Sequence, residues 1–152
     1  MKAKINKKLF TDKYILVDKN DVRFLYPIKE YQFDSRYVCD NSGNVYLIKL
    51  DQGSEWLCLK IKPFTTSDGY VEYVLTTKYK KKKHVQAQRI VAYLYLIKPA
   101  NKNYVNHKNG KRNDNYYKNL EWVTHSENIT HSYRVLNRKV WNKGKVLDSK
   151  QT

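Results

Sequence analysis

The sequence predicts an α+β fold in which a small N-terminal antiparallel β-sheet precedes a helix and a compact strand–strand–helix unit. Short apolar segments in the first half alternate with polar residues, as strands do, and end at turn-forming residues. After residue 84 the apolar spacing becomes helical, then strand-like, then helical again. The length of 152 residues allows one or two small domains. We predict a β-rich region over 1–83, a mixed domain over 84–136 and a basic extension over 137–152.

Several short strands are expected in the N-terminal half. The apolar runs Tyr14–Val17 and Phe24–Tyr26 suggest short strands or an arm. The segment RYVCDNSGNVYLIKL predicts two strands around the turn Asn41–Asn44, where glycine can adopt a positive φ. WLCLKIKPF alternates as a strand does, and Asp68-Gly69 predicts a turn into a further strand, Tyr70–Leu75. Together these segments predict one small antiparallel sheet.

A basic segment, Lys78–Lys83, lies between two strand-like runs and predicts a hairpin tip. It holds five lysines and one tyrosine. One interpretation is a solvated turn. We favour a phosphate clamp, because neighbouring lysines on a loop position a nucleic acid without reading its sequence. We interpret the following His84 as a strand-surface residue rather than a metal ligand.

A helix is predicted over Ala87–Ile97, because Ile90, Val91, Leu94 and Ile97 form one apolar face. The Lys-Pro pair that follows ends this helix. We expect the helix to pack beneath the strand–strand–helix unit.

That unit begins with a strand over Tyr104–His107, continues through a polar loop and returns as a second strand over Asn119–Val123. A capping box then starts the last helix, since the Thr124 hydroxyl can accept from the Glu127 backbone N–H while the glutamate reaches back. This order of elements brings the end of the first strand, with Asn106 and His107, against the start of the helix. The expected site therefore contains one imidazole beside several amide oxygens.

The charge balance points to a polyanionic partner. Thirty Lys and Arg against fourteen Asp and Glu give a formal charge of +16, which favours nucleic acid over an ordinary solvated surface. Cys39 and Cys58 form no CxxC pair, which argues against structural zinc and for a reduced intracellular protein. No apolar run is long enough for a signal peptide or a membrane span, so we expect a soluble, cytoplasmic protein.

Three segments, taken together, resemble the His-Asn-His (HNH) endonuclease family, the ββα-metal nucleases. They are the helix RIVAYLYLI, the loop YVNHKNGKRNDN and the strand and helix start NLEWVTHSENI. The likeness is greatest to the small homing endonucleases of phages and introns, in which a small N-terminal module often contacts DNA. The resemblance implies a ββα-metal nuclease unit that hydrolyses phosphodiester bonds in double-stranded DNA. A phage-encoded protein would act in the cytoplasm of a bacterial host.

The resemblance also implies residue roles. The histidine that closes the first strand is the general base of the family, which corresponds to His107. The preceding residue and an asparagine near the helix start hold one divalent ion, Mg²⁺ or Mn²⁺, which corresponds to Asn106 and Asn128. The middle asparagine, Asn119, holds the base and the loop in position. His131 lies on the same helical side as Asn128 and could supplement the metal shell or contact phosphate.

The basic residues expected to contact DNA lie on the hairpin, the first helix, the loop and the C-terminal extension. They are Lys80, Lys81, Lys82, Lys83, Arg89, Lys108, Lys111, Arg112, Arg138, Lys139, Lys143 and Lys145.

The motif also departs from the family pattern. Many relatives have aspartate where this chain has Asn106, and the neutral amide should weaken metal binding without DNA. Taken singly, the asparagines could be turn or surface amides and His107 a satisfied loop-edge histidine. Together they favour a metal-dependent endonuclease, which needs no small-molecule cofactor and would act as a monomer or weak dimer. The alternative is a DNA-binding protein on a decayed HNH fold that no longer cleaves.

Overall fold

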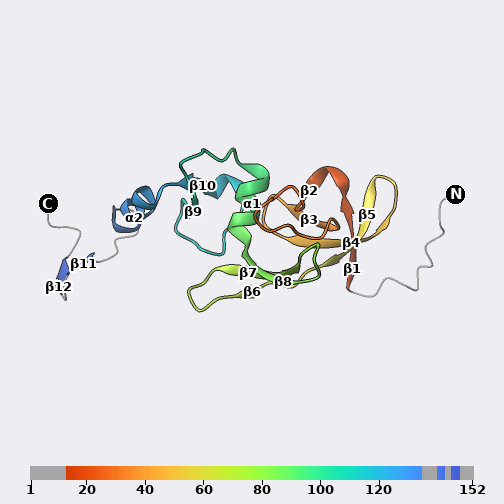
Figure 1. The fold of residues 1–152 in the computed structure, drawn as a ribbon, viewed down its shortest axis with the longest axis horizontal. Helices are drawn as coiled ribbons and strands as arrows, with labels where there is room; N and C mark the ends of the chain where they lie inside the picture. The colour runs from red at the N-terminus through yellow and green to blue at the C-terminus, as the bar shows by residue number, and fades with distance from the viewer. Residues whose placement is uncertain (1–12, 135–139, 143–144, 148–152) are drawn as a thin grey trace.

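The computed structural model describes residues 13–134, 140–142 and 145–147. Its elements follow one another along the longest axis, from the N-terminal sheets, past a central helix, to the ββα unit (Figure 1). The fold is α+β, as the sequence predicts. None of the helices in the described part of the chain is long and apolar enough to cross a membrane.

The N-terminal strands form a five-stranded antiparallel sheet in the order β1-β5-β4-β3-β2. The strands are β1 (Tyr14–Asp18), β2 (Val22–Phe24), β3 (Tyr37–Asp40), β4 (Val45–Asp51) and β5 (Glu55–Lys60). A short 3-10 helix, Lys19–Asp21, links β1 to β2. The predicted turn at Asn41–Asn44 joins β3 to β4, and Gly43 there has φ +90°.

A separate three-stranded sheet, in the order β6-β7-β8, carries the basic hairpin. Its strands are β6 (Phe64–Thr65), β7 (Val71–Thr76) and β8 (Lys82–Gln86). The prediction of one small N-terminal sheet was therefore wrong. Both edges of β5 are already bonded, to β1 and to β4, so β7 pairs with β6 and β8 instead.

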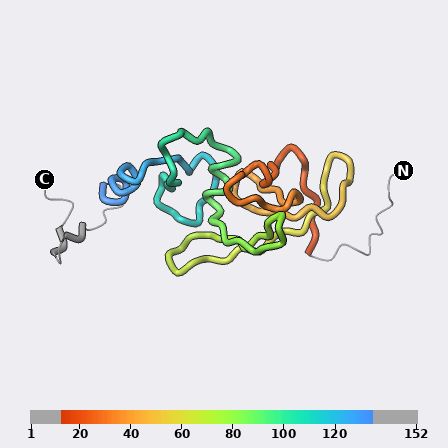
Figure 2. Tube along the Cα trace, viewed as in Figure 1, coloured from red at the N-terminus to blue at the C-terminus, as the bar shows by residue number. Residues whose placement is uncertain are grey.

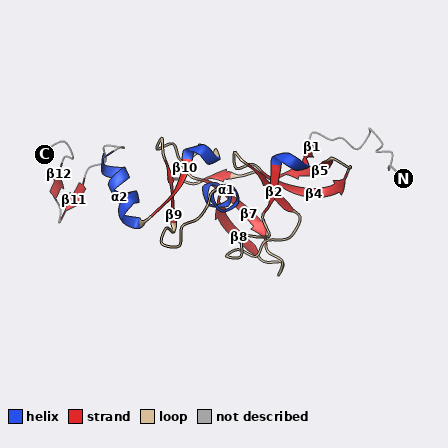
Figure 3. Cartoon of the chain, turned by 90° about the horizontal axis from the view of Figure 1, so that it is seen from above, coloured by secondary structure: helices blue, strands red, loops and turns tan. Residues whose placement is uncertain are grey.

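Helix α1 (Ala87–Tyr95) lies between these sheets and the ββα unit, and the view from above shows the same order (Figure 3). It ends two residues earlier than predicted. Leu96 still donates its N–H to Ala92 O, but its backbone is extended, with φ −118° and ψ 150°. Ile97 consequently leaves the predicted apolar face and is 95% exposed.

The ββα unit comprises β9 (Tyr104–His107), β10 (Leu120–Val123) and α2 (His125–Arg134). The predicted second strand starts one residue later than expected, because Tyr117–Asn119 forms a 3-10 helix. The capping box is present: Thr124 N donates to Glu127 Oε2 at 2.8 Å, and Glu127 N donates to Thr124 Oγ1 at 3.2 Å. Helix α2 therefore begins where the sequence predicts.

One hydrophobic core joins the N-terminal half to the ββα unit. It includes Leu25 just after β2, Val45 from the first sheet, Tyr73 from the second, Ile90 from α1 and Leu120 from β10. The predicted boundary between residues 83 and 84 falls inside β8, so the regions on either side of it share this core. In the predicted C-terminal extension, β11 (Val140–Asn142) and β12 (Lys145–Leu147) pair as an antiparallel hairpin.

The capping box yields a stability prediction. Thr124→Ala removes the acceptor for the Glu127 N–H and should lower the free energy of unfolding by about 1 kcal/mol. Urea unfolding measures the loss, and amide hydrogen exchange should place it in α2. The matched control is Thr130→Ala, at an exposed position of the same helix. An equal loss in the two variants would contradict a capping role for Thr124.

Candidate active site

The end of β9 and the first two turns of α2 enclose a polar cavity of about 240 Å³. Asn106 and His107 enter it from β9, and Asn128 and His131 enter it from α2. The register of β9 with β10 fixes this arrangement, since His107 pairs with Leu120 and Asn106 with Glu121. Four of the residues predicted for the active site thus line one cavity. The remaining lining residues are Tyr70, Val105, Gly110, Arg112, Ile129, Ser132 and Tyr133.

His107 is buried, with 5% of its surface exposed. Its Nε2 lies 3.0 Å from Asn115 Oδ1. Because an amide oxygen can only accept, Nε2 carries the hydrogen and Nδ1 keeps a free lone pair. Burial lowers the pKa of His107 below its ordinary value, and the nearby Arg112 charge acts in the same direction. The imidazole is therefore neutral at pH 7 and able to accept a proton.

Asn115 is a site residue that the sequence analysis missed. It is buried, and the turn between β3 and β4 supports it from the far side. A Cβ on Gly43 would lie 3.1 Å from Asn115 Cβ, so glycine allows the close approach as well as the positive φ. Asn115 follows Asp114 in a polar loop, and no local pattern marks it as the partner of His107.

Asn119 holds the loop rather than the imidazole. Its Oδ1 accepts from Asn109 N at 3.1 Å, and its Nδ2 donates to Asn109 Oδ1 at 3.0 Å and Asp114 O at 2.9 Å. These bonds close the loop between β9 and β10. The positioning role predicted for Asn119 is thus divided in the structure: Asn119 bonds the loop, and Asn115 bonds His107.

Asn106 is buried, and its Nδ2 donates to Glu121 Oε1 at 2.9 Å. This bond fixes the amide, leaving Oδ1 as the atom available to a ligand in the cavity. Asn128 lines the same cavity from α2. Two amide oxygens suit a hard cation such as Mg²⁺ or Mn²⁺, which keeps several waters in its shell. The donor set therefore fits the predicted ion, with Glu121 as a neighbouring carboxylate that the sequence analysis did not identify.

Of two further histidines, His131 lies at the cavity and His84 lies away from it. His131 Nε2 lies 3.2 Å from Lys108 O, so this histidine ties α2 to the loop while lining the cavity. His84 is exposed on β8, 3.8 Å from Glu72, as expected for a strand-surface residue.

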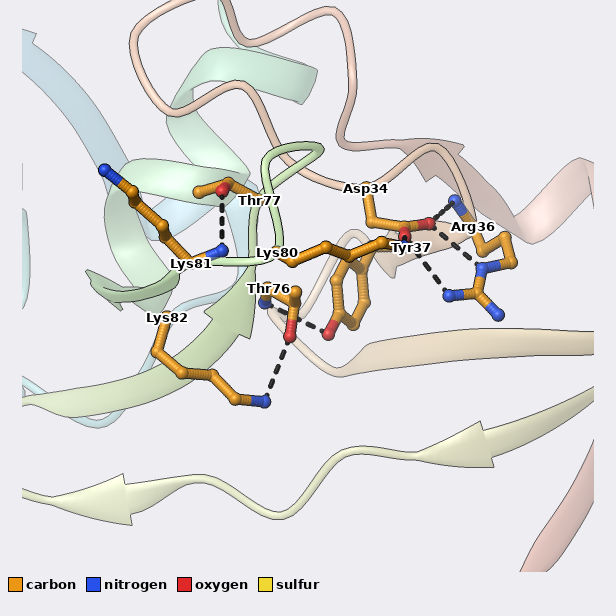
Figure 4. A network of polar contacts seen from close by, with 8 residues as sticks. All are labelled: Asp34, Arg36, Tyr37, Thr76, Thr77, Lys80, Lys81 and Lys82. Carbon is orange, nitrogen blue, oxygen red and sulfur yellow. Dashed lines mark hydrogen bonds and ion pairs between the residues drawn. The ribbon is translucent and has the colours of Figure 1, made fainter.

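The lysine hairpin is anchored at its tip by Asp34. Lys80 Nζ lies 3.8 Å from Asp34 Oδ2, while Arg36 Nε donates to the other carboxylate oxygen at 3.0 Å (Figure 4). Figure 4 also shows Lys81 pointing away from this network. The hairpin tip predicted by the sequence is present, but it holds fewer lysines than expected.

Lys82 and Lys83 belong to strand β8 and therefore face opposite sides of the sheet. Lys82 Nζ donates to Thr76 Oγ1 at 3.0 Å, and Lys83 Nζ lies 5.4 Å from the centre of the Tyr31 ring. The lysines of this segment accordingly present charge in more than one direction.

Arg89, predicted to contact DNA, has partners within the fold. Its guanidinium donates to Tyr31 Oη at 3.1 Å and Asn103 O at 3.0 Å, and it pairs with Glu30 at 3.4 Å. These contacts brace α1 against neighbouring segments, and the DNA contact of Arg89 stays a prediction.

Two other loop lysines, Lys108 and Lys111, are exposed. Of the predicted C-terminal contacts, Arg138, Lys139 and Lys143 lie outside the described residues. Lys145 begins β12.

Comparisons with known proteins agree with the fold and the motifs. No family model matches the chain. It is 34% identical over 121 residues to the uncharacterized HNH endonuclease L247 of Acanthamoeba polyphaga mimivirus, an alignment over 78% of this chain and 28% of the relative. It is 33% identical over 96 residues to the uncharacterized HNH endonuclease L245 of the same virus, over 59% of this chain and 28% of the relative. The chain thus spans just over a quarter of the length of each relative.

A solved structure aligns with a larger share of this chain. The HNH homing endonuclease I-HmuI, in a study of its DNA binding and cleavage, matches with a TM-score of 0.60 and 28% identity. The alignment covers 83% of this chain and 62% of that protein. The resemblance predicted from the motifs is confirmed: the chain is related to the HNH endonucleases by both sequence and fold.

The buried imidazole leads to a pH prediction. The pKa of His107 lies below its unfolded value of about 6.5, so the neutral ring contributes stability that is complete above that pH. This contribution is lost as the pH falls through the folded pKa. Urea unfolding between about pH 7.5 and pH 5 should show a steeper loss for the wild type than for His107→Gln. The exposed-histidine variant His84→Gln should keep the wild-type slope, and a slope unchanged in His107→Gln would refute the assignment.

Proposed function

We propose that this chain is a metal-dependent endonuclease of the homing type that hydrolyses phosphodiester bonds in double-stranded DNA. The observation that carries the proposal is the cavity that the buried His107 lines together with Asn106 and Asn128. A neutral imidazole is suited to take a proton from water near neutral pH. The relation to HNH endonucleases supports the same chemistry.

His107 would act as the general base through Nδ1, because Nε2 bonds to Asn115. The water oxygen forms a bond to phosphorus as its proton passes to Nδ1. The bond from phosphorus to the leaving oxygen then breaks. Asn115 keeps the ring in the tautomer that this transfer needs and is thus a positioning residue.

Asn106 and Asn128 would hold one Mg²⁺ or Mn²⁺ through their amide oxygens. When bound, the ion supplies positive charge to the phosphorane and to the leaving oxygen. Two neutral protein ligands attract a cation weakly, so substrate phosphate is needed to complete a tight shell. Glu121 holds the Asn106 amide in place and adds a negative charge beside it.

The proposed substrate follows from the charge of the chain. A formal charge of +16 favours a polyanion, and the exposed lysines of the hairpin and the active-site loop can contact phosphates. We propose that the N-terminal sheets and the C-terminal basic segment provide the remaining DNA contacts. One ββα unit per chain supplies one active site, so cleavage of both strands requires two chains or two successive nicks.

A second candidate function is DNA binding without cleavage, on a decayed HNH fold. The observation in its favour is the neutral Asn106 at the position where many relatives have aspartate. Incubating supercoiled plasmid with the protein separates the two candidates. Nicked or linear product that depends on Mg²⁺ or Mn²⁺ supports the endonuclease. Binding without product at any divalent concentration supports the alternative.

The general base gives a direct mutational prediction. His107→Ala should reduce metal-dependent cleavage by about a hundredfold or more, because proton transfer loses its acceptor. DNA affinity should stay near the wild-type value in a gel-shift titration. His107→Gln can still donate to Asn115 and should show the same loss of cleavage in a fully folded protein. His125→Ala, at an exposed position outside the cavity, is the control. Substantial cleavage by both His107 variants would rule out this base.

A further prediction concerns the hairpin. Replacing Lys81 and Lys82 with alanine should weaken binding about equally for all DNA sequences, because lysine–phosphate interactions do not read bases. The slope of log affinity against log salt should fall by about one for each phosphate interaction removed. Fluorescence anisotropy over a salt series measures both effects, with Lys118→Ala, at an exposed position of the 3-10 helix before β10, as the control. A changed sequence preference at constant slope would show instead that the hairpin reads bases.

A further inference from the structure

One wall of the active-site cavity comes from outside the ββα unit. Tyr70 lies in the turn between β6 and β7, and its ring centre is 6.1 Å from that of His107. The turn is tightly built: Thr66 N donates to Tyr70 O at 2.9 Å, Tyr70 N donates to Thr66 Oγ1 at 3.1 Å, and Gly69 has φ +88°. Figure 2 shows this turn extending from the hairpin sheet beneath the ββα unit. Tyr70 is therefore held in place by its own segment.

Arg112, from the loop between β9 and β10, lies against this wall. Its guanidinium carbon is 4.7 Å from the centre of the Tyr70 ring, and Nη1 donates to Asp68 O at 2.5 Å. A guanidinium has five N–H donors, so most of its donors are not used by this bond. Within residues 13–134, Arg36 pairs with Asp34 and Arg89 pairs with Glu30, whereas no carboxylate lies within ion-pair distance of Arg112.

We propose that Arg112 is a catalytic residue that binds the non-bridging oxygens of the phosphodiester cleaved beside His107, and that Tyr70 and Asp68 position its guanidinium. The inference rests on the proposed function. It goes beyond a general phosphate contact, because it assigns Arg112 to the reacting phosphate and adds Tyr70 to the site.

The chemistry of the cavity supports this assignment. Negative charge grows on the non-bridging oxygens as water adds to phosphorus, and a fixed cation that already faces them stabilises that charge most. The planar guanidinium matches two phosphate oxygens at once and stacks on an aromatic ring, whereas the lysine ammonium is a point charge without a planar face.

The origin of Tyr70 adds a further consequence. The turn that holds Tyr70 belongs to the same sheet as the lysine hairpin. DNA bound along that sheet would therefore be positioned by the segment that also fixes Arg112, which ties DNA placement to phosphate placement. All the other residues that line the cavity come from the ββα unit and its loop.

The experiment measures single-turnover cleavage of supercoiled plasmid with enzyme in saturating excess. Arg112→Ala should slow the rate constant by about a hundredfold or more. The matched control, Lys118→Ala, removes an exposed charge from the short 3-10 helix that follows the same loop and should leave the rate near wild type. Arg112→Lys should recover little of the rate.

Guanidinium chloride at low, non-denaturing concentration should restore part of the cleavage rate to Arg112→Ala and none to His107→Ala. A purely structural arginine does not permit this rescue.

Two tyrosine variants test the positioning role. Tyr70→Phe keeps the ring under the guanidinium and should cleave at close to the wild-type rate. Tyr70→Leu removes the ring and should slow cleavage toward the rate of Arg112→Lys, while thermal unfolding shows that the protein remains folded.

The outcomes distinguish failure of the proposed endonuclease function from failure of the role assigned to Arg112. Wild-type protein that cuts no plasmid overturns the proposed function, and the role of Arg112 with it. Wild-type cleavage with Arg112→Ala as active as Lys118→Ala overturns the role of Arg112 alone. A slowed Arg112→Ala whose salt slope also falls by about one, with no guanidinium rescue, shows an ordinary DNA contact and likewise overturns it.

Discussion

The buried face of α1 is the constraint on which the other elements depend. Ile90, Val91 and Ala92 are fully buried, and burial of each large aliphatic side chain contributes roughly 1.5–3 kcal/mol. Ala92 O accepts from Leu96 N and also from Trp122 Nε1 of β10, so the end of the helix and the ββα unit share one acceptor. The N-terminal sheets and the nuclease unit are therefore positioned against one short helix.

This arrangement explains how a cavity in a two-stranded unit comes to be completed by distant segments. Gly43 lets the first sheet approach Asn115, which orients His107, and the second sheet contributes Tyr70. Two strands and one helix have too little surface to bury polar side chains on all sides. The N-terminal sheets supply that surface. They also lower the local dielectric constant around His107, and a low dielectric constant favours the neutral imidazole.

Features encoded by neighbouring residues were predictable from the sequence. The capping box at Thr124 and the turn at Gly43 each depend on a few adjacent positions, and both are present. The pairing of β9 with β10 joins two strands across a single loop and is present as well. Partners separated by many residues were not predictable. Arg89 is a basic residue on a helix in the sequence, and only the fold brings Glu30, fifty-nine positions away, to its guanidinium.

The same reasoning applies to the candidate site. The spacing of His107, Asn106 and Asn128 was sufficient to predict that they meet, because strand, loop and capped helix follow one another directly. The identity of the group that bonds His107 was not predictable, because Asn115 and Asn119 stand four positions apart in one polar loop. Only the path of that loop decides which amide faces the ring.

The two halves of the cavity differ in how firmly they are held. Asn106 and His107 come from buried positions on β9, whereas no described residue of α2 is buried, although that helix carries Asn128 and His131. Local opening free energy follows buried apolar contact, so α2 separates from β9 more readily than β9 separates from the core. A ligand that bridges Asn106 and Asn128 would add a link between α2 and β9 and so favour the closed position of the helix. The observed affinity of that ligand would then depend on the equilibrium between closed and open α2 as well as on the contacts themselves.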